Sequence, residues 1–152
     1  MGRNQESGTR NQGFRGLLAW QKADELASAV YRALRHVPSA DKWLASQAIR
    51  AAISVPANIA EGYGRGSLGD YMRFLDIARG SFAELEYYLH FMAREGIIDA
   101  SETAHLEEIK QEAARLLNGL WKSLKAKGRN GSWDRTGTIT RGDLTDDVSI
   151  NP

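Results

Sequence analysis

The sequence predicts an all-α fold, an antiparallel up-down-up-down bundle of four helices. Apolar residues recur at three- and four-residue spacing in four long segments, and no segment alternates apolar and polar residues as a strand would. Short links separate the segments, which favours antiparallel neighbours. We expect one domain over residues 14–127. The polar head, 1–13, and the polar tail, 128–152, show no sustained period and are expected to be disordered.

The first helix is expected over residues 17–36, and Pro38 then prevents its continuation. Its apolar face repeats at helical spacing over several turns. The residues of this face are Trp20, Ala23, Ala27, Val30, Leu34 and Val37.

The second helix, expected over residues 41–61, contains very little charge. Arg50 is the only charged residue between Trp43 and Ala60. A helix that is apolar nearly all round is covered nearly all round. We therefore expect a partner subunit to cover its outer side, and we expect Pro56 to bend it, because proline removes a backbone donor.

The third helix is expected over residues 68–95. Ser67, followed three residues later by Asp70, forms a capping pair at its start, and Gly96 ends it. Gly80 lies in its middle, where glycine costs about 1 kcal/mol relative to alanine. Because its neighbours Ser81 and Ala83 are also small, Gly80 indicates a close helix crossing.

The fourth helix is expected to open at Asp99 with Glu102 and to end at Lys127, before Gly128. Its last turns carry several cations, which are typical complements of a helix dipole.

Before the third helix, residues 62–67 read GYGRGS. This segment is interpreted as a helix stop, a turn and a cap, or alternatively as a phosphate contact, because backbone amides at a helix start can bind anions beside Arg65.

Composition excludes several classes of function. The 152 residues include no cysteine, which excludes disulfides, thiolate metal sites and a cysteine nucleophile. No apolar run reaches the ~18 residues of a membrane span, and residues 1–13 lack the apolar core of a signal peptide. We expect a cytoplasmic protein without a membrane partner. The net charge of +1 means that nucleic-acid binding would need a local patch.

Catalytic and metal-binding patterns are incomplete. Glu102 and His105 match the Glu-x-x-His of di-iron bundles, but Glu86 and His90 are four residues apart rather than three. No Gly-x-Ser-x-Gly elbow occurs. We therefore expect a non-enzymatic protein with no catalytic residue, metal or cofactor.

Polar residues form a stripe along the second helix. Polar groups on an apolar helix must be satisfied if they are buried. We expect Arg50 and Glu61 to pair with acids or bases of the third helix. The stripe is interpreted as a structural network at a subunit interface, or alternatively as a ligand or nucleic-acid surface. The interface or network residues predicted here are Gln47, Ser54, Pro56, Asn58, Glu61, Gly80, Glu84 and Glu86.

Four segments together resemble a known family. They are LAWQKA at 18–23, SVPANIAEG at 54–62, FLDIARGS at 74–81 and ELE at 84–86. The chain resembles the four-helix-bundle proteins encoded within intervening sequences of bacterial 23S ribosomal RNA genes. The same superfamily includes Avd, the accessory protein of diversity-generating retroelements. The resemblance covers residues 14–127 and implies a ring-like homopentamer.

The resemblance implies a role with nucleic acid rather than catalysis. The leading hypothesis is a homo-oligomeric scaffold that binds RNA or DNA through repeated arginine patches, as an accessory factor of an RNA- or retroelement-related process. The alternative is an Avd-like adaptor in mutagenic retrohoming, which docks on a reverse transcriptase and has little nucleic-acid affinity of its own. The candidate nucleic-acid-binding residues are Lys22, Arg50, Arg65, Arg73 and Arg79.

Overall fold

The computed structural model describes residues 12–130, and it has four long α-helices and no strand within this range. This confirms the predicted all-α class. The predicted disorder of the head and tail concerns residues that lie mostly outside the described range, and it stays a prediction. The elements are η1 (Gly13–Gly16), α1 (Leu18–Leu34), η2 (Ser39–Asp41), α2 (Lys42–Tyr63), α3 (Leu68–Arg94) and α4 (Ala100–Arg129).

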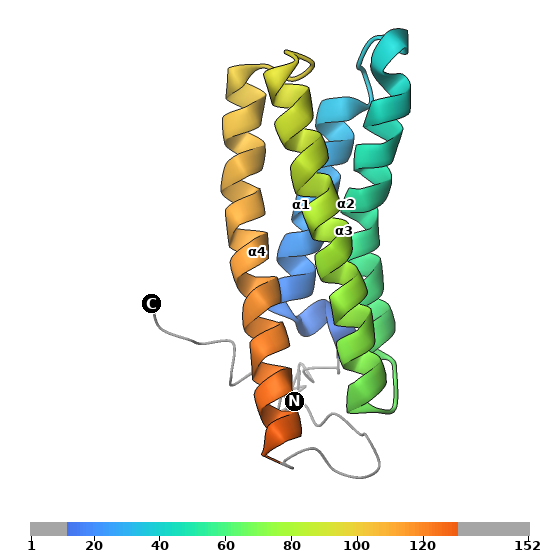
Figure 1. Cartoon of the computed structure of the whole chain (residues 1–152), viewed down its shortest axis with the longest axis vertical. Helices are drawn as coiled ribbons and strands as arrows, with labels where there is room; N and C mark the ends of the chain where they lie inside the picture. Colours follow the sequence, from blue (N-terminus) through green and yellow to red (C-terminus); the bar gives the residue numbers. More distant parts are fainter. Residues whose placement is uncertain (1–11, 131–152) are drawn as a thin grey trace, which may run out of the picture.

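The four helices lie side by side around a shared core (Figure 1). Helix α2 packs on α1 and α3, and α4 packs on α1 and α3. The α2–α3 connection lies at one end of the molecule and the α3–α4 connection at the other (Figure 1). The α2–α3 connection is therefore near the final turns of α4.

The predicted apolar faces form the core. The apolar face expected for α4 from helical spacing comprises seven residues, and all are buried: Leu106, Ile109, Ala113, Leu116, Leu117, Leu120 and Leu124. Trp20, expected on the apolar face of α1, is half-buried at the edge of the core, and Phe74, which helical spacing also places on the inward face of α3, is half-buried. Helical spacing therefore identified the buried side of each helix correctly but not the residues at its margin.

The predicted helix caps are confirmed. The hydroxyl of Ser67 accepts the backbone N–H of Asp70 at 3.1 Å, and the carboxylate of Asp99 accepts the backbone N–H of Glu102 at 2.8 Å. Gly96 follows α3 with a φ of 72°, a left-handed conformation that favours glycine.

Two glycines predicted as helix stops lie inside helices. Helix α2 continues through Gly62 to Tyr63, and α4 continues through Gly128 to Arg129. A Cβ atom on Gly62 would lie 2.7 Å from Cδ2 of Tyr71, and one on Gly128 would lie 3.0 Å from Cδ2 of Leu68. Both glycines therefore permit close packing against α3.

The close crossing predicted at Gly80 is wrong. Within residues 12–130, a Cβ atom on Gly80 would meet nothing within 4 Å. Gly80 lies on the exposed side of α3, away from the core. The small residue that brings α2 and α3 together is Gly62.

The outer side of α2 remains open to solvent in the single chain. Trp43 is 68% exposed and Ile53 is 50% exposed. Pro56, which also belongs to α2, is buried. Nothing within residues 12–130 covers this charge-poor side.

The hydroxyl of Tyr71 is buried without a hydrogen-bond partner among the described residues. Burial raises the pKa of Tyr71 above its usual value of 10.0, and the neighbouring Tyr63 adds to the increase. The unfolded state therefore loses the phenol proton at a lower pH than the folded state.

We predict that Gly62→Ala lowers the free energy of unfolding by about 1–3 kcal/mol, because the added methyl group overlaps the ring of Tyr71. Gly119→Ala is the matched control. Gly119 also lies inside a helix, but its Cβ atom would meet nothing within 4 Å in the described chain. The control substitution is expected to raise the free energy of unfolding by up to about 1 kcal/mol. Denaturant titration measures both variants, and equal effects would contradict the close approach at Gly62.

We predict that Tyr71→Phe leaves the stability at pH 8 unchanged or raises it by about 1 kcal/mol, because a partnerless buried hydroxyl is removed. Above pH 10 the natural chain should lose stability faster than the variant, since ionised tyrosine favours the unfolded state. Unfolding midpoints at pH 8 and pH 11 test this, and parallel losses in both proteins would contradict it.

Candidate nucleic-acid interface

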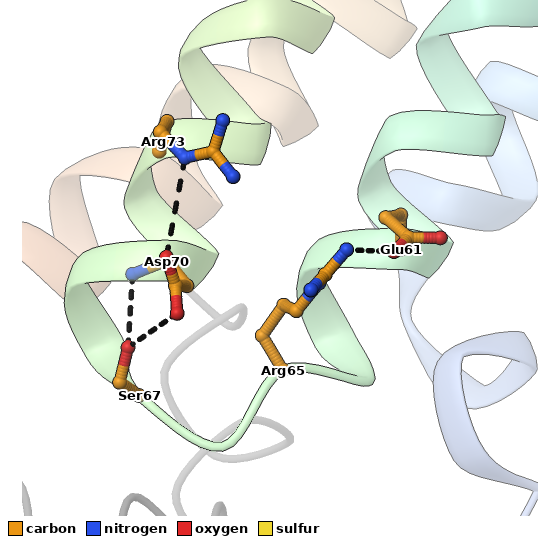
Figure 2. A network of polar contacts seen from close by, with 5 residues as sticks. All are labelled: Glu61, Arg65, Ser67, Asp70 and Arg73. Carbon is orange, nitrogen blue, oxygen red and sulfur yellow. Dashed lines mark hydrogen bonds and ion pairs between the residues drawn. The ribbon is translucent and has the colours of Figure 1, made fainter.

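The turn between α2 and α3 brings two of the candidate arginines to one aromatic ring. The guanidinium carbons of Arg65 and Arg73 each lie 4.7 Å from the ring centroid of Phe74. Arg65 comes from the turn itself, and Arg73 comes from the second turn of α3 (Figure 2). Stacking on an aromatic face orients a guanidinium without removing it from solvent.

Both arginines also have a carboxylate partner. Arg65 forms an ion pair with Glu61, and Nε of Arg73 lies 3.9 Å from Oδ1 of Asp70 (Figure 2). The Ser67 hydroxyl in turn donates to Oδ2 of Asp70 at 3.1 Å. The two cations are therefore ordered but electrically balanced, and a phosphate would have to displace a carboxylate.

A second cation–aromatic cluster joins α3 to α4. The indole N–H of Trp121 donates to Oδ1 of Asp76 at 2.7 Å. The guanidinium of Arg79 lies 4.3 Å from the Trp121 ring, and the ammonium of Lys125 lies 4.4 Å from it. Arg79 is also paired with Asp76 at 3.5 Å. The cluster fixes Arg79 beside the last turns of α4.

The two remaining candidates lie apart from these clusters. Nζ of Lys22 is 2.6 Å from Oε2 of Glu25, and Lys22 lines a groove with residues of α4, including Glu112. Arg50 is exposed on α2 and has no ion pair among the described residues. The structure thus brings Arg65 and Arg73 together and separates the other three candidates.

The polar stripe of α2 forms a hydrogen-bonded contact with α3. The hydroxyls of Ser54 and Ser81 are 2.8 Å apart, and Nδ2 of Asn58 donates to the Ser54 hydroxyl at 3.0 Å and to its carbonyl at 2.8 Å. Gln47 is half-buried on the same helix. The expected pairing of Glu61 with α3 is wrong, because Glu61 pairs with Arg65 in the turn.

Glu84 and Glu86 have partners within the same chain. Glu84 accepts a hydrogen bond from the Tyr88 hydroxyl at 2.9 Å. Glu86 accepts one from Lys110 of α4 at 3.2 Å, and Lys110 also pairs with Glu107 at 2.7 Å. Burial alone would lower the pKa of Lys110, but its hydrogen bonds to Glu107 and Glu86 outweigh burial and raise it. Lys110 is therefore a stable cation that links α3 to α4.

The described residues contain no cluster of three or more metal-ligating side chains. Glu102 and His105 therefore have no further protein ligands nearby in this part of the chain. Among the same residues, no helix combines the length and apolar character needed to cross a bilayer.

Sequence reasoning missed the aromatic rings that organise the cations. Phe74 was expected to face inward, and Trp121 was not considered. The adjacency of Arg73 and Phe74 was visible, but stacking of Arg65 depends on the path of the turn. The contact of Asp76 with Trp121 joins residues of different helices, and no local pattern predicts it.

Comparison with curated proteins finds no match. Comparison with protein families matches residues 15–119 to one family, described as 23S rRNA-intervening sequence protein. This range covers more than half of the chain and includes α1, α2, α3 and the first two thirds of α4. The chain belongs to the 23S rRNA-intervening sequence protein family.

Proposed function

We propose that this protein is a non-enzymatic homo-oligomeric scaffold that binds nucleic acid, as an accessory factor of an RNA- or retroelement-related process. The observation that carries the proposal is the pair of exposed arginines, Arg65 and Arg73, oriented on Phe74 at one turn. Membership of a family named for 23S rRNA intervening sequences supports RNA as the ligand.

Binding would use phosphate contacts more than base contacts. A guanidinium can exchange an exposed carboxylate for a phosphate, to which it can form two parallel hydrogen bonds. Arg65 and Arg73 would exchange Glu61 and Asp70 in this way. Phosphate contacts position a protein on nucleic acid but carry no sequence information directly.

Assembly would supply the number of contacts that one chain lacks. We propose an antiparallel bundle that forms a ring-like homopentamer, as the family resemblance implies. The exposed apolar residues Trp43 and Ile53 on the charge-poor side of α2 support a contact between copies there. Repeated copies of the arginine turn would bind one nucleic acid through several weak contacts at once.

We predict that the full chain elutes as a pentamer of about 84 kDa, five times the 16.8 kDa of one chain. Ile53→Arg should shift it to smaller species, because a charge would enter an apolar contact. Leu18→Arg is the matched control, since Leu18 is 49% exposed and lies at the start of α1. Light scattering after size exclusion measures the mass, and a monomeric natural chain would contradict the assembly.

We predict that the protein binds a structured RNA with an affinity that falls steeply between about 50 and 200 mM salt. Arg65→Gln with Arg73→Gln should weaken this binding several-fold, whereas Arg94→Gln should not. Arg94 is also exposed and paired, with Glu95, but lies at the opposite end of α3. Fluorescence anisotropy measures the affinities.

Salt-independent binding would contradict direct phosphate contact. Absence of binding even at low salt would favour the alternative, an Avd-like adaptor that docks on a reverse transcriptase. In that case the exposed apolar side of α2 would be tested next as a protein-docking surface.

A further inference from the structure

The charge carried by the side chains of α4 changes from mainly negative to positive along the helix. Its first half carries the acids Glu102, Glu107, Glu108 and Glu112 together with Lys110. Residues 113–130 contain no acid. They contain five cations, which are Arg115, Lys122, Lys125, Lys127 and Arg129.

Three of these cations lie on one exposed face. Lys122, Lys125 and Arg129 are exposed and follow one another at three- and four-residue spacing. Within residues 12–130 none of the three has a carboxylate partner, although Lys125 stacks on Trp121. By contrast, Lys22, Arg65, Arg73 and Arg79 are all paired with acids.

The helix dipole accounts for Arg129 but not for Lys122 and Lys125. The dipole effect falls off within the last turn of a helix. In α4 that turn holds Lys127 and Arg129, whereas Lys122 and Lys125 lie before it. Three cations that lack a carboxylate partner among residues 12–130 repel one another at this short spacing, so the arrangement favours an anionic partner.

The end of α4 lies beside the arginine turn. Gly128 packs on Leu68, the first residue of α3, and the α4 terminus is at the same end of the molecule as the α2–α3 connection (Figure 1). We define the basic pole as Lys122, Lys125 and Arg129 together with Arg65 and Arg73. At the opposite end of the bundle, four cations are balanced by four acids. The four cations are Arg32, Arg35, Lys42 and Arg94, and the four acids are Asp41, Glu95, Asp99 and Glu102.

We propose that the basic pole is the docking surface for the phosphate backbone of duplex RNA, and that Lys122, Lys125 and Arg129 of α4 supply most of the electrostatic contact. This inference rests on the proposed function. The three cations of α4 span about 10 Å at 1.5 Å per residue, which matches about three phosphates along one strand. The family match ends at residue 119, so it does not include these cations.

The aromatic rings at the pole favour a duplex over a single strand. Proteins that bind single strands stack bases on open aromatic rings. Here cations lie on the rings of Phe74 and Trp121, and the indole N–H of Trp121 is bonded to Asp76. Among residues 12–130, the rings of Phe74 and Trp121 at the pole are therefore covered by cations, so the pole presents charges to a phosphate backbone rather than open rings to bases.

The test compares two triple variants of the full chain by anisotropy with a labelled RNA hairpin over about 50–200 mM salt. The pole variant is Lys122→Gln, Lys125→Gln and Arg129→Gln. The control variant is Arg32→Gln, Arg35→Gln and Lys42→Gln, which removes the same charge at the other end. Circular dichroism and size exclusion verify that both variants keep the fold and assembly of the natural chain.

The pole variant should lose about tenfold or more in affinity at low salt, and its salt slope should become shallower by about 2–3, since each phosphate contact contributes about 0.9. The control should change the slope by less than about 1. A DNA duplex should bind with a similar slope, because its phosphates are equivalent, and an unpaired strand should bind more weakly.

The outcomes separate this inference from the proposed function. If the natural chain binds neither RNA nor DNA, the proposed function fails and the inference with it. If RNA binds but the pole variant keeps its affinity and slope, the inference alone is overturned. A tighter complex with the unpaired strand, or binding of the DNA duplex without binding of RNA, also overturns it.

Discussion

The close approach of α2 and α3 at Gly62 is the contact on which the rest of the site depends. A side chain at this position would overlap the ring of Tyr71 and crowd Cβ of Phe74, at 2.9 Å. Because glycine leaves this space free, the end of α2 lies directly on the first turns of α3. The short turn that follows then places Arg65 over the same ring as Arg73.

Two kinds of cation occur at this end of the bundle. Arg65 and Arg73 are held by a ring and by carboxylates, so they are ordered but electrically balanced. Lys122, Lys125 and Arg129 of α4 are exposed and have no carboxylate partner among residues 12–130, so no paired carboxylate offsets their positive charge. In the proposed scaffold, the first kind would orient a phosphate and the second would attract it.

The helices and their buried faces could be predicted from the sequence, because helical periodicity is a local signal. Glycine was the main source of error, since it permits both a turn and a close contact. Gly62 and Gly128 were interpreted as stops but are packing positions. Gly80 was interpreted as a packing position, although it is nine residues after the buried Tyr71 and therefore lies on the opposite side of α3. Of the site, Arg65 and Arg73 were predicted, but their stacking on Phe74 depends on tertiary geometry.

The central claim is that this chain assembles into a ring whose basic surface holds RNA. Native mass spectrometry of the full chain mixed with an RNA hairpin tests both parts in one measurement. We expect a mass equal to five chains of 16.8 kDa plus one or more RNA molecules. A spectrum that contains only single chains free of RNA, at a salt concentration where phosphate contacts are strong, would contradict it.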